Sequence, residues 1–190
     1  MRRFDTPVEQ ATTPSLEALQ AYSLGQKTKD IKGDRAAVPF FERAIQLDPK
    51  FAVAYALLGT SYSNLGQEEL ARETFRKAYG LRDRVSNREK FYIDSYYNDG
   101  VTGDMEKAQQ TYELWAQVYP RDDKPTGNLG LIHDYFGQHE KSLAQAREAL
   151  GLNPGSGLRY ANLIQSYLRL AELSQLSTFE RVKCFGMSRG

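Results

Sequence analysis

The sequence predicts an all-α fold, a solenoid of four full helix-turn-helix repeats followed by a fifth, partial repeat. Two pairs of markers support this prediction. Leu24-Gly25 returns 34 positions later as Leu58-Gly59, and Ala37-x3-Phe41 returns 34 positions later as Ala71-x3-Phe75. A single pair of short helices cannot bury its own apolar side. Recurrence at one spacing therefore predicts neighbouring helix pairs that stack on one another.

Composition bounds the function. The chain has 190 residues, of which 41% are apolar and 26% are charged, and its formal net charge is +1. This balance provides no field that would attract nucleic acid or anionic lipid, and no apolar run approaches the roughly 20 residues that span a membrane. The first twenty residues lack the apolar core of a secretion signal. We therefore expect a cytoplasmic chain that binds no nucleic acid and does not enter the membrane.

The N-terminal segment and the first repeat are separated by a change in pattern. Residues 1–13 are polar and lack a helical apolar period, so we expect a flexible tail or linker. Thr13 is expected to be an N-cap, with Pro14 at the first helical position and Glu17 in the first turn. The array is then expected to cover residues 14–172, and its first repeat lies near 18–51.

The second repeat, near residues 52–85, shows the pattern most completely. Gly59 and Ala71 are small at the points where the backbones of two crossing helices must approach. Gly66 is expected to end the first helix, because glycine readily adopts the left-handed conformation of a C-cap. Glu68-Glu69 follow at the start of the second helix, where its dipole favours negative charge.

The third repeat, near residues 86–122, departs from the rule. The prolines that close the first and third repeats are 71 positions apart, which is twice 34 plus three. We place the three added residues in Asn98–Gly103, where two glycines interrupt the helix and Asp104 can cap the next one. Trp115 takes a position that is small in the other repeats, so we expect a local change in the helix crossing angle.

The fourth repeat, near residues 123–156, restores the small residue with Gly130. A fifth begins at 157–172 but lacks the pattern of a second helix. Residues 173–190 are expected to form a degenerate capping helix or a frayed C-terminus. The capping helix would carry an apolar stripe of Leu173, Leu176, Phe179 and Val182.

The spacing Tyr55-x2-Leu58-Gly59-x2-Tyr62, followed by Ala71-x3-Phe75 and Ala78, resembles the tetratricopeptide repeat (TPR) family over residues 18–171. The resemblance implies a right-handed α-α superhelix whose function is to bind protein, without catalysis, metal or cofactor. A narrower resemblance is to the arrays appended to bacterial serine/threonine kinases and winged-helix transcriptional regulators. It is carried by Thr12–Gln20, Arg88–Tyr92, Val101–Asp104 and Tyr112–Trp115. It implies the regulatory part of a larger bacterial signalling protein.

The family resemblance also implies where a peptide or protein partner would bind. In such arrays the concave face is lined by the first helix of each repeat. Carried over by position, the candidate residues are Tyr22, Gln26, Lys29, Ala56, Thr60, Ser63, Lys90, Asp94, Tyr97, Leu131, Asp134 and Gln165. The residues that clamp a chaperone C-terminal carboxylate in one subtype are not matched, so we expect another kind of partner.

Two other classes of function stay open. A structural or self-associating array, a homodimer through its terminal repeats, is the first alternative. The second is a hydrolase that uses His133, His139 and Cys184, although no nucleophile, base and orienting group share a local context. The basic residues between Arg72 and Lys90 are expected to form a solvated helix face.

Overall fold

The computed structural model describes the backbone of residues 13–187 and the side chains of residues 13–175. Throughout the described backbone the regular structure is helical and no strand is present, which confirms the all-α prediction. The chain divides between Thr111 and Tyr112 into two compact units, and α6 (Met105–Val118) spans the division. Among the described residues, no helix is long and apolar enough to cross a membrane.

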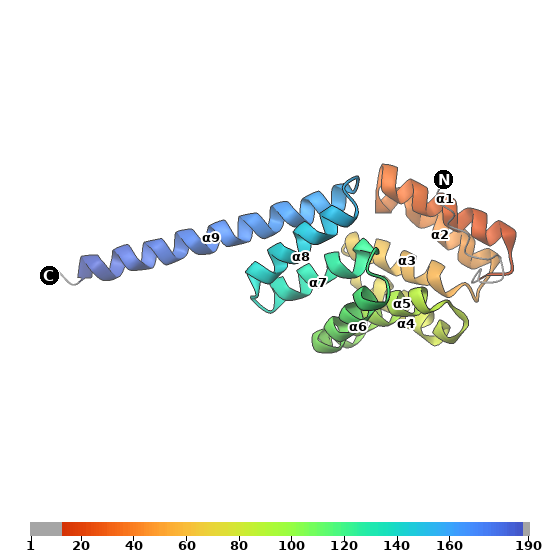
Figure 1. The fold of residues 1–190 in the computed structure, drawn as a ribbon. Coiled ribbons are helices and arrows are strands. Elements are labelled where there is room, and N and C mark those ends of the chain that lie inside the picture. Colours follow the sequence, from red (N-terminus) through yellow and green to blue (C-terminus); the bar gives the residue numbers. More distant parts are fainter. Residues whose placement is uncertain (1–12, 188–190) are drawn as a thin grey trace. The chain divides into compact units, whose positions relative to one another are not determined.

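The first unit contains consecutive helix pairs. In Figure 1, α1 lies beside α2 and α3 lies beside α4, and α2 also contacts α3. A 3₁₀ turn, η2, leads into α5, and a π-helical segment, η3, follows α5. The bounds are α1 Leu16–Lys32, α2 Asp34–Leu47, α3 Ala52–Asn64, α4 Glu68–Gly80, η2 Arg82–Arg84, α5 Asn87–Tyr97 and η3 Asn98–Thr102.

Glycine permits the close approach within each of the first two pairs. A Cβ atom added to Gly25 would lie 2.7 Å from the ring of Phe41, and one added to Gly59 would lie 2.7 Å from the ring of Phe75. Both rings are buried. The recurring small and aromatic positions in the sequence are therefore the two sides of one helix crossing.

The start of α1 differs from the prediction that Thr13 caps it. Ser15 is the N-cap, and its hydroxyl accepts a hydrogen bond from the backbone N–H of Ala18 at 3.1 Å. Thr13 instead donates its hydroxyl to Asp48 at 2.6 Å, at the end of α2. The long-range bond to Asp48 holds Thr13 and Pro14 outside the helix. The predicted tail before Thr13 lies outside the described residues.

The irregular segment η3 lies where the sequence places the three added residues. Gly103 ends it with φ of 68°, a conformation that favours glycine. Asp104 then accepts a hydrogen bond from the backbone N–H of Lys107 at 2.9 Å and caps α6. A Cβ atom on Gly100 would lie 3.3 Å from Phe75, so η3 packs closely on the core of this unit.

The second unit contains α7 (Asp123–Tyr135), α8 (His139–Leu152) and α9 (Gly157–Met187). α7 packs on α8, and α9 packs on both. The sequence placed a boundary at residues 172/173, between a partial repeat and a capping helix. The structure has one uninterrupted helix of 31 residues there. Arg159 of α9 is buried and pairs with Asp123 of α7 at 2.6 Å, which fastens the start of α9.

Candidate functional site

Three of the predicted partner-binding residues share one face of α5. Lys90, Asp94 and Tyr97 follow one another at the i, i+4 and i+7 spacing that places side chains on one side of a helix. The start of α5 is fixed by a capping box in which Ser86 accepts from the backbone N–H of Glu89 and Glu89 accepts from that of Ser86. The local sequence therefore sets where this face begins.

Tyr97 forms a stack with residues from outside α5. The centroid of its ring lies 3.8 Å from that of Tyr79, with an interplanar angle of 13°. The guanidinium carbon of Arg82 lies 3.7 Å from the same Tyr79 centroid. Two groups at that distance cannot share one face of a ring, so Arg82 and Tyr97 cover opposite faces of Tyr79. Cation–π attraction and aromatic stacking stabilise this order.

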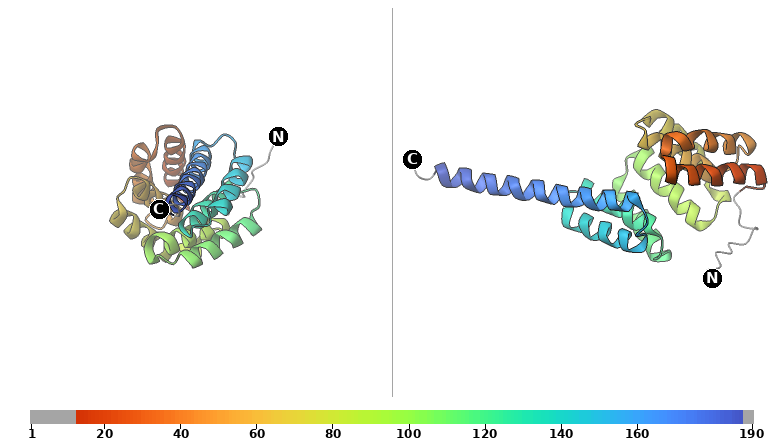
Figure 2. Two further views of the ribbon diagram at one scale, coloured as in Figure 1. Left: turned by 90° about the vertical axis from the view of Figure 1, so that its left-hand side faces the viewer. Right: turned by 90° about the horizontal axis from the view of Figure 1, so that it is seen from above.

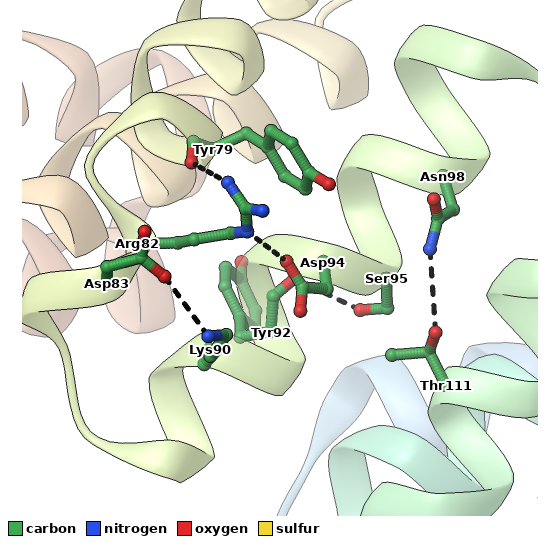
Figure 3. Close-up of polar contacts among 9 residues, drawn as sticks. All are labelled: Tyr79, Arg82, Asp83, Lys90, Tyr92, Asp94, Ser95, Asn98 and Thr111. Carbon is green, nitrogen blue, oxygen red and sulfur yellow. Dashed lines mark hydrogen bonds and ion pairs between the residues drawn. The ribbon is translucent and has the colours of Figure 1, made fainter.

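Ion pairs extend the stack along α5. Nε of Arg82 lies 3.3 Å from Oδ1 of Asp94, and Nη1 of Arg82 donates to the backbone carbonyl of Tyr79 at 2.9 Å. Nζ of Lys90 donates to Oδ1 of Asp83 at 3.2 Å. Figure 3 shows these contacts joining η2 to α5. We name this set the tyrosine–arginine cluster; it comprises Tyr79, Arg82, Asp83, Lys90, Asp94 and Tyr97.

Asp94 is the acidic centre of the cluster. Partial burial raises the pKa of its carboxyl group above the ordinary range, and the positive charges of Arg82, Lys90 and Lys107 only partly oppose this. The side chains of Asp94 and Arg82 are each 28% exposed. Since the charged form of Asp94 is incompletely compensated, a further hydrogen-bond donor from a bound partner would stabilise it.

Beneath the cluster, Thr60 fixes α3 to α5. Its hydroxyl donates to the backbone carbonyl of Ala56 at 3.0 Å and shares a 2.7 Å hydrogen bond with the hydroxyl of Tyr92. Thr60 is 9% exposed and Ala56 is fully buried. The structure therefore places both of these predicted surface residues in the core of the unit. Ser63, one turn later on α3, is half-buried.

One side-chain hydrogen bond joins η3 to α6, and another lies within α5 just before η3. The amide nitrogen of Asn98 donates to Oγ1 of Thr111 at 3.5 Å, and the hydroxyl of Ser95 donates to the backbone carbonyl of Tyr92 at 3.0 Å (Figure 3). Asn98 and Ser95 are both buried. The Asn98 contact therefore holds η3 against α6.

The α1 candidates divide into a packing pair and an ion pair. The ring of Tyr22 packs against Phe41 and Phe51, with centroids 6.2 and 5.0 Å away, and its hydroxyl accepts from Gln26 at 3.1 Å. Burial, aided by the negative charge of Glu89, raises the pKa of the Tyr22 hydroxyl. Tyr22 is therefore a partly buried residue that packs against the core of the first repeat.

Lys29 lies at the turn between α1 and α2. Its Nζ is 2.7 Å from Oδ1 of Asp34, and the amide of Asn64 donates to Oδ2 of Asp34 at 3.0 Å. Burial alone would raise the pKa of Asp34, but the hydrogen bond and charge of Lys29, together with Asn64, hold it below its ordinary value. Asp34 thus links the first two repeats, and its partner Lys29 is not part of the tyrosine–arginine cluster.

The second unit holds the remaining candidates on α7 and α9. Leu131 is 47% exposed, and Gln165 is exposed. Asp134 lies 2.7 Å from Nδ1 of His139 and 3.9 Å from Nε of Arg169, so it connects α7 with α8 and α9. These residues lie in a different unit from the tyrosine–arginine cluster and are considered separately.

The histidines occupy positions within the repeat framework. His133 is 8% exposed, and its Nδ1 lies 3.1 Å from the amide oxygen of Gln138. His139 pairs with Asp134, as above. Within the part of the chain that the structure describes, no group of three or more His, Cys, Asp or Glu residues is placed to hold a metal ion. Cys184 lies outside the described side chains.

Sequence reasoning missed Tyr79 and assigned Arg82 and Asp83 to a solvated helix face. A signal was present, because Tyr79 and Arg82 are three positions apart at the end of a helix, where a cation can reach an aromatic ring. Their contact with α5 depends on the turn η2, and the repeat pattern contains no information about that turn.

Comparisons with known proteins find similarity to one family of helical repeats. Residues 40–73 match a family model described as tetratricopeptide repeat. The chain is similar to anaphase-promoting complex subunit 3 of Schizosaccharomyces pombe, with 29% identity over 126 residues, covering 64% of this chain and 18% of the relative. It is also similar to human tetratricopeptide repeat protein 6, with 24% identity over 179 residues, covering 75% of this chain and 34% of the relative. The chain thus spans about a fifth to a third of these curated relatives.

A solved structure shows the same fold. TTC0263, a thermophilic TPR protein of Thermus thermophilus, superposes with a TM-score of 0.56 at 20% sequence identity. The superposition covers 83% of this chain and 84% of that one. The agreement supports a helical repeat fold.

Proposed function

Because residues 40–73 match a tetratricopeptide repeat model and the described chain is built of helix pairs, we propose that it is a protein-interaction scaffold that binds a peptide or protein segment along the first helices of its repeats. The tyrosine–arginine cluster is the main contact in this proposal. Its support is the layered arrangement of Arg82, Tyr79 and Tyr97, which are the residue types that carry most binding energy at protein interfaces.

Preorganisation favours binding at the cluster. Arg82 is held by a ring, a backbone carbonyl and a carboxylate, so it loses little side-chain entropy when a partner arrives. The cluster contains two cations and two carboxylates, Arg82, Lys90, Asp83 and Asp94, so it offers both donors and acceptors. We infer that the partner is an extended segment of mixed polarity, recognised by hydrogen bonds and by contact with the tyrosine edges.

In the same proposal, Ser63 adds to the surface of the first unit, whereas Leu131, Asp134 and Gln165 form a separate candidate surface on the second unit. Thr60 and Ala56 act from below as supports, and Tyr22, Gln26 and Lys29 hold the first repeat. The fission-yeast relative is by its name a subunit of a protein complex, which accords with a scaffold. A place within a larger bacterial signalling protein stays a prediction from the narrower resemblance.

The experiment is selection of peptides from a random displayed library on the immobilised chain, followed by fluorescence anisotropy with the enriched peptides. Arg82→Ala and Tyr97→Ala should each weaken binding at least about tenfold, which is about 1.4 kcal/mol. Arg76→Ala is the matched control, because it removes one positive charge from the exposed side of α4.

Circular dichroism separates lost contact from lost structure. Tyr97→Phe should retain the stack and most of the helicity, and it should bind better than Tyr97→Ala. If enriched peptides bind Arg82→Ala and Tyr97→Ala as tightly as the wild type, the cluster is not the contact surface. If no peptide is enriched above an unrelated helical protein, the proposed recognition of extended segments fails.

A further inference from the structure

Arg82 and Asp94 lie side by side in the tyrosine–arginine cluster, but their hydrogen-bonding groups are poorly matched. Nε of Arg82 lies 3.3 Å from Oδ1 of Asp94, yet this buried oxygen accepts no hydrogen bond. A well-matched arginine and carboxylate form two parallel hydrogen bonds. Here the contact has the distance of an ion pair without the alignment of a hydrogen bond. The pair therefore has unused hydrogen-bonding capacity.

The unused capacity includes both a donor and an acceptor. Nη1 of Arg82 donates to the carbonyl of Tyr79 and Nε faces Asp94, whereas Nη2 has no hydrogen-bond partner among the described residues. No described residue donates a hydrogen bond to either carboxylate oxygen of Asp94. Nη2 belongs to the same rigid guanidinium fork as Nε, and Figure 3 shows that fork directed at the carboxylate. An unengaged donor and an unengaged acceptor are thus close neighbours.

The pair is recessed relative to its charged neighbours. The side chains of Arg82 and Asp94 are each 28% exposed, whereas those of Lys90 and Asp83 are 43% and 78% exposed. A partner can therefore reach the pair, and a side chain that projects from the partner reaches it more readily than main chain does.

The surrounding charges disfavour a charged ligand. The positive charges that act on the carboxyl group of Asp94 come from Arg82, Lys90 and Lys107, and Asp83 adds a negative charge. A lysine or arginine side chain brought to Asp94 would approach these three cations. An acidic side chain brought to Arg82 would approach two carboxylates. Like charges across an interface repel, so a neutral ligand avoids both penalties.

We propose that Arg82 and Asp94 together bind the primary carboxamide of a glutamine or asparagine side chain in the partner segment. The N–H of the carboxamide donates to the carboxylate of Asp94, and its carbonyl accepts from Nη2 of Arg82. The nitrogen and oxygen of a carboxamide are joined to one carbon, as are the two oxygens of a carboxylate, so one such group can face both residues. This inference rests on the proposed function and specifies the chemical group that the tyrosine–arginine cluster recognises.

Five displayed peptide libraries test the proposal on the full chain. Each has one fixed central residue, which is Gln, Asn, Glu, Lys or Ser, and the random positions of every library omit Asn and Gln. The Gln or Asn library should be enriched most strongly on the wild type. In the enriched peptides, replacing the fixed carboxamide by the corresponding carboxylate should weaken binding at least about tenfold, measured by fluorescence anisotropy.

Asp94→Asn distinguishes recognition from a structural role. The substitution keeps the shape of the side chain but replaces a group that only accepts hydrogen bonds by one that also donates. The wild-type preference for the carboxamide peptide over its carboxylate counterpart should therefore be lost or reversed, whereas a structural defect would weaken both peptides alike. Glu73→Gln is the matched control, because it neutralises a 61% exposed carboxylate of α4 outside the cluster and should keep the wild-type preference.

Strongest enrichment of the Glu, Lys or Ser library overturns the proposal. Equal wild-type affinity for the carboxamide and carboxylate peptides also overturns it, and so does a preference that Asp94→Asn leaves unchanged. If peptides from any library lose affinity for Tyr97→Ala, the proposed function holds even where the carboxamide assignment fails. If no library is enriched, the proposed function fails and the carboxamide assignment fails with it.

Discussion

The crossing of α3 and α4 allows a quantitative prediction for Gly59→Ala. The added Cβ would lie 2.7, 2.8 and 3.1 Å from three carbon atoms of the Phe75 ring, whereas ordinary carbon contacts are about 3.5 to 4.0 Å. Phe75 is 3% exposed, stacks on Tyr96 at 5.5 Å and lies close to Gly100, so its ring has little room to move.

Two opposing effects set the magnitude. Overpacking a filled core costs about 1 to 3 kcal/mol. Replacing glycine by alanine within a helix stabilises the fold by up to about 1 kcal/mol, because alanine has the higher helix propensity. The net expectation is a loss of about 1 to 2 kcal/mol in the free energy of unfolding, measured by urea denaturation with circular dichroism.

Gly151→Ala is the control for helix propensity. Gly151 lies in α8, and a Cβ there would meet nothing within 4 Å, so this variant should be as stable as the wild type or slightly more stable. The substitution Phe75→Leu should lower the free energy of unfolding less in the Gly59→Ala variant than in the wild type, because the smaller side chain relieves the overlap with the added Cβ. If Gly59→Ala is as stable as Gly151→Ala, close contact does not determine this crossing and the reasoning is refuted.

Three further predictions concern other local contacts. Gly127→Ala should destabilise the second unit by on the order of 3 kcal/mol, because its Cβ would displace the buried guanidinium of Arg159; thermal unfolding that matches the wild type would contradict this. The lowered pKa of Asp34 means that its pair with Lys29 stabilises the fold fully above about pH 4 and less as the pH falls further. The stability difference between wild type and Asp34→Asn should therefore shrink from pH 5 to pH 3, and a difference independent of pH would contradict it. Ser86→Ala should cost about 1 kcal/mol and speed amide exchange at the start of α5; unchanged exchange there would show that the capping box is dispensable.

The periodic sequence pattern was sufficient to predict the helix pairs. Gly59 and Phe75 belong to one repeat and meet at one helix crossing, so their fixed spacing in the sequence predicts the contact between them. The start of α1 was predicted wrongly, because Thr13 is drawn to Asp48, a residue 35 positions away. Capping preferences depend on neighbouring residues only, so they do not predict a hydrogen bond between residues that are far apart in the sequence.

The residues of the candidate site could be predicted only in part from the sequence. The positions of the repeat pattern predicted Lys90, Asp94 and Tyr97 as binding residues, and the structure has all three on one face of α5. The pattern did not name Tyr79, which contacts Tyr97 in the proposed cluster, and it included Thr60, which is buried. Exposure and the path of an irregular turn depend on tertiary packing, whereas the repeat pattern describes only the regular helices.

The repeat pattern also failed to predict that α9 is one long helix. Its sequence has no glycine or proline between residues 158 and 185, so local propensity permits a continuous helix. The repeat rule nevertheless predicted a boundary at residues 172/173. The rule assumes that each first helix is followed by a turn and a second helix, whereas α9 continues through residues 172/173 without a turn (Figure 2).

Amide hydrogen exchange with and without a selected peptide tests the account most directly, because it locates the contact surface in the unmodified chain. Binding should slow exchange in residues 79–97, which include η2 and α5, and leave residues 139–152 of α8 unchanged. Protection confined to α8, or to the outward side of α4 around Arg72 and Arg76, would contradict the assignment of the tyrosine–arginine cluster as the partner-binding surface.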